Sequence, residues 1–582
     1  MAILSAFTAC NNKDTGAIET AYPSIDVKYP DTRKDTTVKD DYFGTVVADP
    51  YRWLENDTSA ETANWVKAEN EITQGYLSKI PFRDAIKKRY EALYNYEKYS
   101  APFKEGKYTY YYLNTGLQNQ SVLYRQEADN ATPEVFLDPN TFSSDGTTSL
   151  SGIAFSNDGS MAAYNISEGG SDWQKIVVMD AITKKQTNDT LELKFSGASW
   201  KGNEGFYYSN YHRGGGSVLS AKNENHKLYY HKLGTSQNDD KVVYGNDAAP
   251  VRYMGGYVSE DQKWLIISTA NETYGNALYV KDLTNPGSPV IPIVTDMKNS
   301  YGIVDIDDKY FYIQTDKDAP TNKLVIAPLT NPGMANWKTI IDAKPEVLNV
   351  SSGGGFLFGT YMKDAVNKVF QFDKTGKQIR EITLPGLGSA GGFYAKHDEK
   401  ELYYVFTSYI SPATIYKMDI ATGKTSLYKE SKVSYKPEDY VSEQVFYTSK
   451  DGTKIPMIIT HKKGIELNGK NPCLLYGYGG FGISLTPSFS TSNLILLENG
   501  GIYAVANLRG GGEYGEDWHN QGIKTKKQNV FDDFIAAASY LVDKKYTSRE
   551  KLAIAGGSNG GLLVGACITQ QPDMCKVAFP AV

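Results

Sequence analysis

A long run of short strands, from about Tyr90 to about Ser434, limits the folds open to this chain more than any other feature. It covers about 345 of the 582 residues, and segments rich in Tyr, Phe and Val alternate there with Gly, Asn and Asp at turns. Tyrosine is abundant, with 44 residues, and aromatic residues make up 13% of the chain, which favours strands. A theme of strand, polar turn and strand recurs in Phe155–Tyr164, Trp200–Ser209 and Val258–Ser268. Its spacing of about 45–55 residues is typical of four-stranded propeller blades, so we expect roughly seven blades; an array of β-sandwiches is the alternative.

A second constraint is the glycine-rich sequence Gly556–Gly561 near the end of the chain. The apolar run Leu552–Ala555 precedes it, and the helix-like run Leu562–Ile568 follows it. Strand, Gly-x-Ser-x-Gly and helix together form a nucleophile elbow, a strained turn that leaves the serine hydroxyl exposed above a sheet. Ser558 is therefore the predicted nucleophile, and the alternative is a tight turn that contains an incidental serine.

After about Ser434 the pattern changes to alternating strands and helices. The sequence predicts a hairpin with Asp451 and Gly452 at its turn, two buried strands and an amphipathic helix, over Tyr447–Thr460, Cys473–Tyr476, Ile502–Asn507 and Val530–Val542. Such alternation favours a mainly parallel sheet with helices on both faces, as in the α/β-hydrolases.

The first part of the chain differs from both regions. Glu61–Leu77 predicts a helix, with Trp65, Ile72, Tyr76 and Leu77 on one face. Ahead of it, Met1–Cys10 is a short apolar stretch that ends in small residues before a cysteine, similar to the tail of a bacterial lipoprotein signal. We therefore expect a lipid on Cys10, a periplasmic or membrane-anchored protein, and a start upstream of Met1. A cytoplasmic protein with a disordered N-terminus is the alternative.

A serine nucleophile needs hydrogen-bond donors for the oxyanion that forms during acyl transfer. One donor should be the backbone N–H of Asn559, the residue after the nucleophile. A second should come from the loop Tyr476–Gly482, which follows a predicted strand. The nearby Gly510-x-Gly512-x-x-Gly515 formally matches a dinucleotide-binding fingerprint, but the helix that should start there is interrupted, so we expect no cofactor.

The catalytic base is not evident in the sequence. In the hydrolase fold the acid and the histidine follow the serine, yet none of the 24 residues after Ser558 is a histidine. We expect the triad Asp and His to lie beyond Val582. The six histidines of the chain are each expected to be surface or packing residues: His212, His226, His231, His397, His461 and His519.

Composition excludes other classes of protein. The net charge of −6 argues against a nucleic-acid partner, and no apolar run reaches the roughly 20 residues that cross a bilayer. No Cys-x-x-Cys or Cys/His cluster suggests a metal site, and Cys473, Cys567 and Cys575 are expected to be buried small residues.

Six motifs together resemble the prolyl oligopeptidases, serine peptidases of the α/β-hydrolase fold with a seven-bladed propeller. The resemblance covers nearly everything from about Tyr22 to Val582 and lies in Asp49–Glu55, Tyr112–Gln120, Gly170–Trp173, Tyr476–Phe481, Ala506–Gly515 and Gly556–Gly561. It implies four segments: a signal and linker over 1–21, the N-terminal helical part of a discontinuous peptidase domain over 22–89, the propeller over 90–434, and a hydrolase domain over 435–582 that is incomplete at the C-terminus.

The resemblance also implies the chemistry. Ser558 would be the nucleophile of a serine endopeptidase that cleaves short peptides after proline through an acyl-enzyme, and the propeller would gate access. The Tyr478 hydroxyl would complete the oxyanion hole with the Asn559 N–H, and Phe481 would line the proline pocket with help from Phe195 and Met254 on propeller loops. The family's Arg and Cys near the substrate have no match around Thr269–Thr273. A monomer is expected, and the alternative function is an inactive propeller and half-hydrolase that acts as a binding module.

Overall fold

The computed structural model describes residues 25–128, 130–211, 222–245 and 247–582. Cys10 and His212 therefore lie outside the described residues, as does the signal-like segment. The chain divides into two compact units, the first ending at Arg89 and the second beginning at Tyr90. Each unit is described by itself below.

The first unit holds a hairpin and the predicted helix. Its elements are β1 (Lys39–Tyr42), β2 (Thr45–Ala48), a 3-10 turn (Arg52–Glu55), α1 (Ala60–Ser78) and the start of α2 (Arg83–Tyr94). Ser59 caps α1 by accepting the Thr62 N–H, which explains where the helix begins. The hairpin was not expected from the sequence, because its strands bury almost nothing and so lack the alternation of a half-buried strand.

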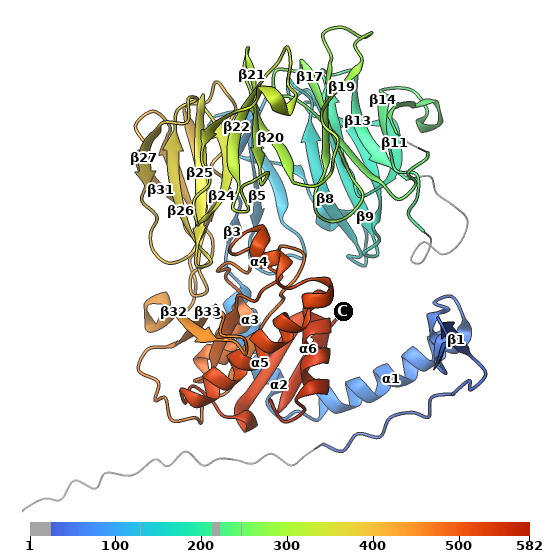
Figure 1. Cartoon of the computed structure of the whole chain (residues 1–582), viewed down its shortest axis with the longest axis vertical. Helices are drawn as coiled ribbons and strands as arrows, with labels where there is room; N and C mark the ends of the chain where they lie inside the picture. Colours follow the sequence, from blue (N-terminus) through green and yellow to red (C-terminus); the bar gives the residue numbers. More distant parts are fainter. Residues whose placement is uncertain (1–24, 129, 212–221, 246) are drawn as a thin grey trace, which may run out of the picture. The chain divides into compact units, whose positions relative to one another are not determined.

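The second unit begins with a propeller of seven sheets, as expected (Figure 1). The first two sheets consist of β3 (Lys98–Tyr99), β4 (Phe103–Glu105), β5 (Tyr108–Asn114), β6 (Val122–Gln126) and β7 (Glu134–Leu137), and of β8 (Thr148–Phe155), β9 (Met161–Glu168), β10 (Trp173–Asp180) and β11 (Gln186–Lys194). The next two consist of β12 (Ser199–Lys201), β13 (Gly205–Asn210), β14 (Lys227–Lys232) and β15 (Lys241–Tyr244), and of β16 (Tyr253–Val258), β17 (Trp264–Ala270), β18 (Ala277–Asp282) and β19 (Val290–Val294).

The remaining three blades have the same antiparallel four-stranded form. They consist of β20 (Tyr301–Ile306), β21 (Tyr310–Thr315), β22 (Lys323–Pro328) and β23 (Lys338–Ile341); of β24 (Val347–Gly353), β25 (Phe356–Lys363), β26 (Val366–Phe372) and β27 (Gln378–Ile382); and of β28 (Ser389–Gly391), β29 (Glu401–Thr407), β30 (Thr414–Asp419) and β31 (Thr425–Lys429). The recurring sequence theme is the turn between the first two strands of a blade. In the second blade, for example, Asp158 accepts the Ser160 N–H within that turn.

Aromatic and aliphatic side chains between neighbouring blades form the propeller core. Ile176 of the second blade packs with Trp200 of the third, and Leu278 of the fourth with Phe311 of the fifth. Clusters of this kind join each blade to the next from the first to the seventh, which explains why a chain so rich in tyrosine and phenylalanine folds this way.

The rest of the second unit is a six-stranded mixed sheet in the order β32-β33-β35-β34-β36-β37. Its strands are β32 (Tyr440–Thr448), β33 (Lys454–Lys462), β34 (Cys473–Tyr476), β35 (Ile502–Ala506), β36 (Leu552–Gly557) and β37 (Val577–Ala581). The strands β32, β33 and β35 pair antiparallel, and β35, β34, β36 and β37 pair parallel. The expected hairpin is β32 and β33, with Gly452 at φ 91° in its turn.

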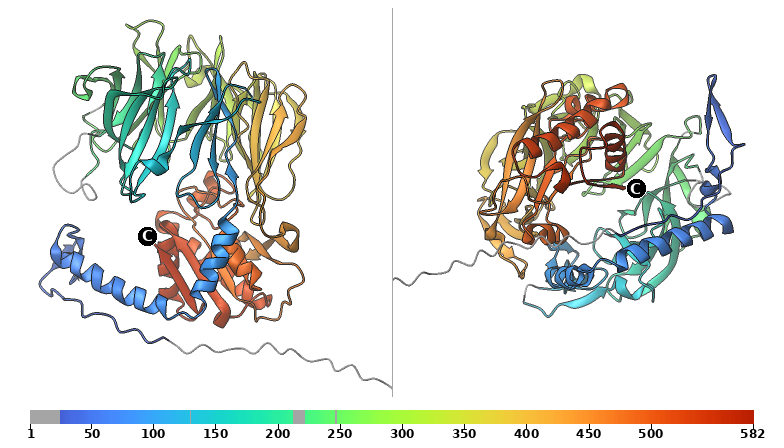
Figure 2. Two further views of the ribbon diagram at one scale, coloured as in Figure 1. Left: turned by 180° about the vertical axis from the view of Figure 1, so that it is seen from behind. Right: turned by 90° about the horizontal axis from the view of Figure 1, so that it is seen from below.

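Helices cover both faces of this sheet, as the alternating pattern predicts. They are α3 (Thr491–Glu498), α5 (Gln528–Asp543) and α6 (Asn559–Gln570); a short helix, α4 (Glu516–Asn520), lies between β35 and α5 in the chain. Phe534 of α5 and Leu563 of α6 pack on one face, whereas Leu494 of α3 packs with Leu93 of α2 in a separate cluster. Figure 2 (left) shows the strands from the side opposite α5 and α6.

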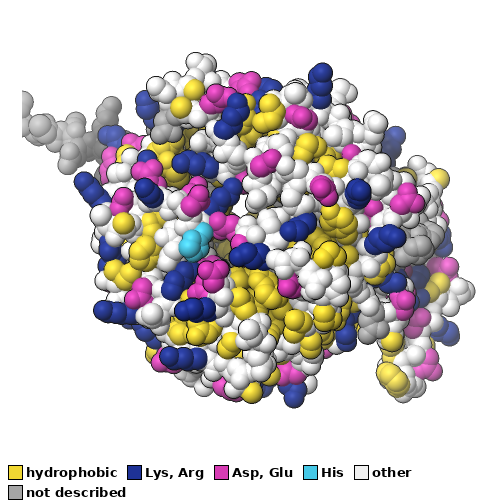
Figure 3. Space-filling model, turned by 90° about the horizontal axis from the view of Figure 1, so that it is seen from above, with side chains coloured by type: hydrophobic (Ala, Val, Ile, Leu, Met, Phe, Trp, Pro, Cys, Tyr) yellow, Lys and Arg dark blue, Asp and Glu magenta, His cyan; other side chains and the backbone are white. Residues whose placement is uncertain are grey.

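The surface gives two further observations. On the face in Figure 3, basic and acidic side chains are interspersed among apolar ones. Across the described ranges, no helix combines the length and the apolar character that crossing a membrane would require.

Candidate active site

Ser558 occupies the sharp turn between β36 and α6 that the sequence predicts. Its backbone lies at φ 55° and ψ −118°, its side chain is exposed, and its hydroxyl forms no cap on the helix. Two glycines of this turn are required by close packing: a Cβ on Gly556 would lie 2.4 Å from the Gly560 carbonyl oxygen, and one on Gly560 would lie 2.8 Å from the Gly477 carbonyl oxygen. The strained backbone of this turn thus holds an exposed hydroxyl above the parallel edge of the sheet.

The loop after β34 brings Tyr478 next to this turn. The Asn559 side-chain amide donates to the Tyr478 carbonyl at 2.5 Å, and a Cβ on Gly480 would lie 2.6 Å from the Asn559 side-chain carbon. Two of the predicted residues, Tyr478 and Asn559, therefore lie side by side, with the Asn559 N–H at the first position of α6. That position presents a free backbone donor to an anion.

The glycine-rich segment Arg509–Gly515 supports the same loop. Gly482 N donates to the Gly510 carbonyl at 3.0 Å, and Leu485 N donates to Glu513 Oε1 at 2.9 Å. The glycines that formally match a dinucleotide fingerprint instead allow backbones to pack closely, since a Cβ on Gly510 would lie 2.7 Å from the Gly479 carbonyl oxygen.

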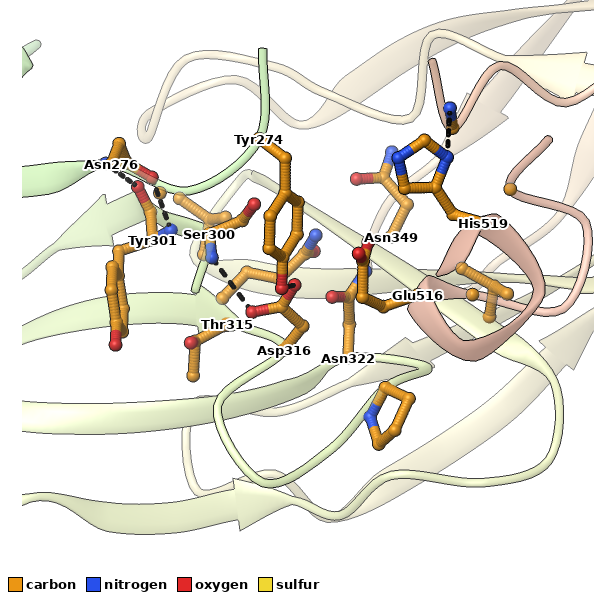
Figure 4. Close-up of a pocket in the computed structure, with 18 of the residues that line it drawn as sticks. Tyr274, Asn276, Ser300, Tyr301, Thr315, Asp316, Asn322, Asn349, Glu516 and His519 are labelled. Carbon is orange, nitrogen blue, oxygen red and sulfur yellow. Dashed lines mark hydrogen bonds between the residues drawn. The ribbon is translucent and has the colours of Figure 1, made fainter. Parts of the chain in front are cut away.

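A cavity of about 560 Å³ lies beside this segment, between it and the propeller strands (Figure 4). The predicted pocket residue Phe481 lines it with φ 54° and 59% exposure. Asp316 faces it while accepting hydrogen bonds from the Tyr274 hydroxyl and the Ser300 N–H, both at 2.8 Å. Burial, together with the charge of Asp316, raises the pKa of Glu516 in the same wall to about 7.

The other two predicted pocket residues form a separate group, outside the lining of that cavity. The Phe195 ring packs edge-on against Tyr211, Tyr211 stacks on His226 at 4.1 Å, and His226 Nδ1 accepts the Met254 N–H at 3.0 Å. Phe195 lies on a loop, as expected, but Met254 does not. It belongs to strand β16, where pairing with β17 leaves it only 3% exposed.

No described histidine forms a hydrogen bond with the Ser558 hydroxyl. His519 lines the cavity together with Phe481 and is therefore the first histidine to consider as a base. Its Nδ1, however, lies 2.8 Å from the Gly510 carbonyl oxygen and 3.0 Å from Gly482 N. His231 lies between Asp240 and Asp189 within the propeller. These contacts agree with packing roles.

The sequence assigned no role to Asp316, Glu516 or Glu513, although Glu513 lies within the motif Ala506–Gly515. Only the approach of segments distant in the chain places these common acidic residues near the site. In the part of the chain that the structure describes, no group of three His, Cys, Asp or Glu side chains is placed to hold a metal ion.

Comparisons with known proteins agree with this arrangement. Residues 30–431 match the family model "Prolyl oligopeptidase, N-terminal beta-propeller domain", and residues 487–582 match "Prolyl oligopeptidase family". A prolyl endopeptidase of Elizabethkingia miricola is 56% identical over 568 residues, which is 97% of this chain and 80% of that protein.

Solved structures give the same answer for the fold. One from a study of two prolyl endopeptidases has a TM-score of 0.91 at 38% identity, covering 95% of this chain and 82% of its own. Prolyl oligopeptidase B of Galerina marginata, bound to a 25-residue macrocyclization substrate, has a TM-score of 0.89 at 32% identity with the same coverage. The chain belongs to the prolyl oligopeptidase family of serine peptidases, and its propeller is the N-terminal domain of that family.

Proposed function

We propose that this protein is a serine endopeptidase that hydrolyses short peptides on the C-terminal side of proline. The observation that carries the proposal is the exposed Ser558 hydroxyl on its strained turn, with Asn559 opening α6 beside it and Tyr478 hydrogen-bonded to Asn559. The substrate preference is supported by the relatives named above, which are prolyl endopeptidases.

The chemistry follows from these groups. Ser558 Oγ attacks the carbonyl carbon of the proline residue while a base takes its proton, and the resulting oxyanion accepts hydrogen bonds from the Asn559 N–H and the Tyr478 hydroxyl. Collapse expels the amine of the next residue, which takes the proton, and water then hydrolyses the acyl-enzyme. Phe481 is the apolar wall proposed to contact the proline ring, and its exposure in the cavity supports that role.

A binding module without catalysis is the second candidate. It is favoured by one observation, namely that none of the described residues hydrogen-bonds the Ser558 hydroxyl. In that case peptides would enter the cavity without being cleaved.

A peptide library incubated with the protein expressed from its complete gene distinguishes the candidates. The proposal expects cleavage after proline that is lost in Ser558→Ala. Preferred cleavage after arginine or lysine would contradict the proposed substrate class, and binding without any cleavage would favour the module.

We also propose that a lipid on Cys10 anchors the protein in the periplasm. Labelling cells with a radioactive fatty acid tests this proposal, with Cys10→Ser as the control.

A further inference from the structure

Lys527, at the start of α5, joins the two segments that carry the proposed oxyanion donors. Its Nζ donates to the Gly479 carbonyl at 2.7 Å and to Asn559 Oδ1 at 2.9 Å. The Asn559 amide in turn donates to the Tyr478 carbonyl at 2.5 Å. The three hydrogen bonds form a closed link between α5, the loop after β34 and the first residue of α6.

The surroundings of Lys527 differ from those of an ordinary surface lysine. The side chain is partly buried, and this burial lowers the pKa of its ammonium group. Within the described ranges no carboxylate forms an ion pair with it, and both of its acceptors are neutral amide oxygens. Holding a cation there costs desolvation that no salt bridge offsets. Such a position is suited to a site where negative charge develops during a reaction.

The loop that Lys527 holds packs closely against its neighbours through its backbone. A Cβ on Gly477 would lie 2.7 Å from the Phe534 ring, and one on Gly479, at φ 64°, would lie 2.3 Å from Val530 Cγ1. Val530 and Phe534 belong to α5, the helix that Lys527 precedes, and both are fully buried. Lys527 therefore adds its hydrogen bonds where this loop and α5 already lie in close contact.

We propose that Lys527 is a positioning residue that fixes Tyr478 and Asn559 in the geometry the oxyanion requires. The proposal rests on the proposed function, because it takes these two residues as the donors. Lys527 touches neither substrate nor the reacting atoms in this account; it acts through the Gly479 carbonyl and the Asn559 side chain.

The test uses the protein expressed from its complete gene and a fluorophosphonate probe. Ser558 gives its hydroxyl proton to the base as Oγ attacks the phosphorus, a P–O bond forms, the P–F bond breaks and fluoride leaves. The labelling rate therefore reports the oxyanion site whatever peptide the enzyme prefers. Lys527→Met is expected to slow labelling roughly 10- to 100-fold and to lower kcat for peptides by a similar factor, with KM changed less than about 3-fold. Lys527→Arg, which keeps the charge and donors, should recover part of the rate.

Lys526→Met is the matched control, because the neighbouring Lys526 is exposed. It should label at the wild-type rate. If Lys527→Met folds poorly, Asn559→Ala carries the test, because it removes the same link and keeps the backbone N–H. Where Lys527→Met folds, the double variant should be little slower than Asn559→Ala alone, since both substitutions break the hydrogen bond between Lys527 and Asn559.

Several outcomes would overturn the inference. Labelling of a folded Lys527→Met protein at the wild-type rate would do so, and so would fully additive effects of the two substitutions. A wild type that is labelled at Ser558 but does not cleave after proline contradicts only the substrate proposed above and leaves the Lys527 result valid. A wild type that is not labelled contradicts both.

Discussion

Arg509 and Asp533 form an ion pair in the interior of the peptidase sheet, with Nη2 2.6 Å from Oδ1 and side chains 2% and 0% exposed. Asp533 also accepts the Arg509 N–H, and the guanidinium reaches Asp451 at the hairpin turn. The pair thus connects three parts of the fold. These are the segment Arg509–Gly515, which supports the Phe481 loop, the helix α5, and the hairpin of β32 and β33. Removing Asp533 would leave the buried guanidinium with the half-exposed Asp451 as its remaining carboxylate among the described residues.

Asp533→Ala is therefore expected to lower the free energy of unfolding by about 3–5 kcal/mol. Asp543→Ala, at an exposed position near the end of the same helix, should change it by less than about 0.5 kcal/mol. Urea unfolding followed by circular dichroism measures both. Equal stability of the two variants would show that solvent compensates the Arg509 charge.

Ser558→Ala is expected to reduce peptidase turnover to the residual level while the melting temperature stays close to that of the wild type. The side chain is exposed, and none of the described residues is hydrogen-bonded to its hydroxyl, so its loss removes only the proposed nucleophile. Ser539→Ala on α5 is the control and should keep full activity. Turnover that survives in Ser558→Ala would require a different nucleophile.

Tyr478→Phe is expected to lower kcat roughly 10²- to 10³-fold, or about 2.7–4 kcal/mol of transition-state stabilisation, by analogy with the loss of another oxyanion donor. KM should change far less, because the hydroxyl is proposed to bind the oxyanion and not the ground state. Tyr540→Phe, at a half-buried ring of α5 that packs against Tyr447, serves as the control for removing a tyrosine hydroxyl. A raised KM at unchanged kcat would instead place Tyr478 in substrate binding.

Glu513 should make stability depend on pH. It is 1% exposed, and burial raises the pKa of its carboxyl to about 7 from an ordinary 4.5. Because the folded-state pKa is raised, the stability that protonated Glu513 contributes is fully present below about pH 4.5 and is lost as the pH rises through about 7.

Between those pH values the wild type should therefore lose stability relative to Glu513→Gln, which cannot ionise. Urea unfolding at pH 5 and pH 8 measures the change, with the exposed Glu438→Gln as the control. Parallel pH profiles of the wild type and Glu513→Gln would argue against a buried, titrating Glu513.

Residues 1–582 by themselves are expected to show no peptidase activity above the residual level. No described histidine contacts Ser558, so its hydroxyl stays protonated near neutral pH and remains a weak nucleophile. A fluorogenic proline peptide measures the rate. Turnover that disappears in Ser558→Ala would show that a base is recruited from within these residues. His519, which lines the cavity with Phe481, would then be the first residue to mutate.

Local pattern was enough to predict the propeller and the elbow from the sequence. A blade is a contiguous run of strands and polar turns, and the turn at Ser558 is a contiguous run of strand, glycines and helix, so each is encoded by neighbouring residues. The same holds for α5, whose apolar spacing predicts its extent to within two residues at its start and one at its end. The exposed hairpin Lys39–Ala48 has no such pattern, and it was missed.

What the amino-acid sequence determined by itself is thus the set of local elements, the sharp turn that carries Ser558 and the protein family. Only the tertiary structure decided that Lys527 meets Asn559, that Arg509 meets Asp533, and that Met254 lies within a strand away from the cavity of Phe481. The physical reason is that these contacts join residues from different elements or depend on how a strand pairs. Their energies come from burial and hydrogen-bond geometry, which no local sequence pattern records.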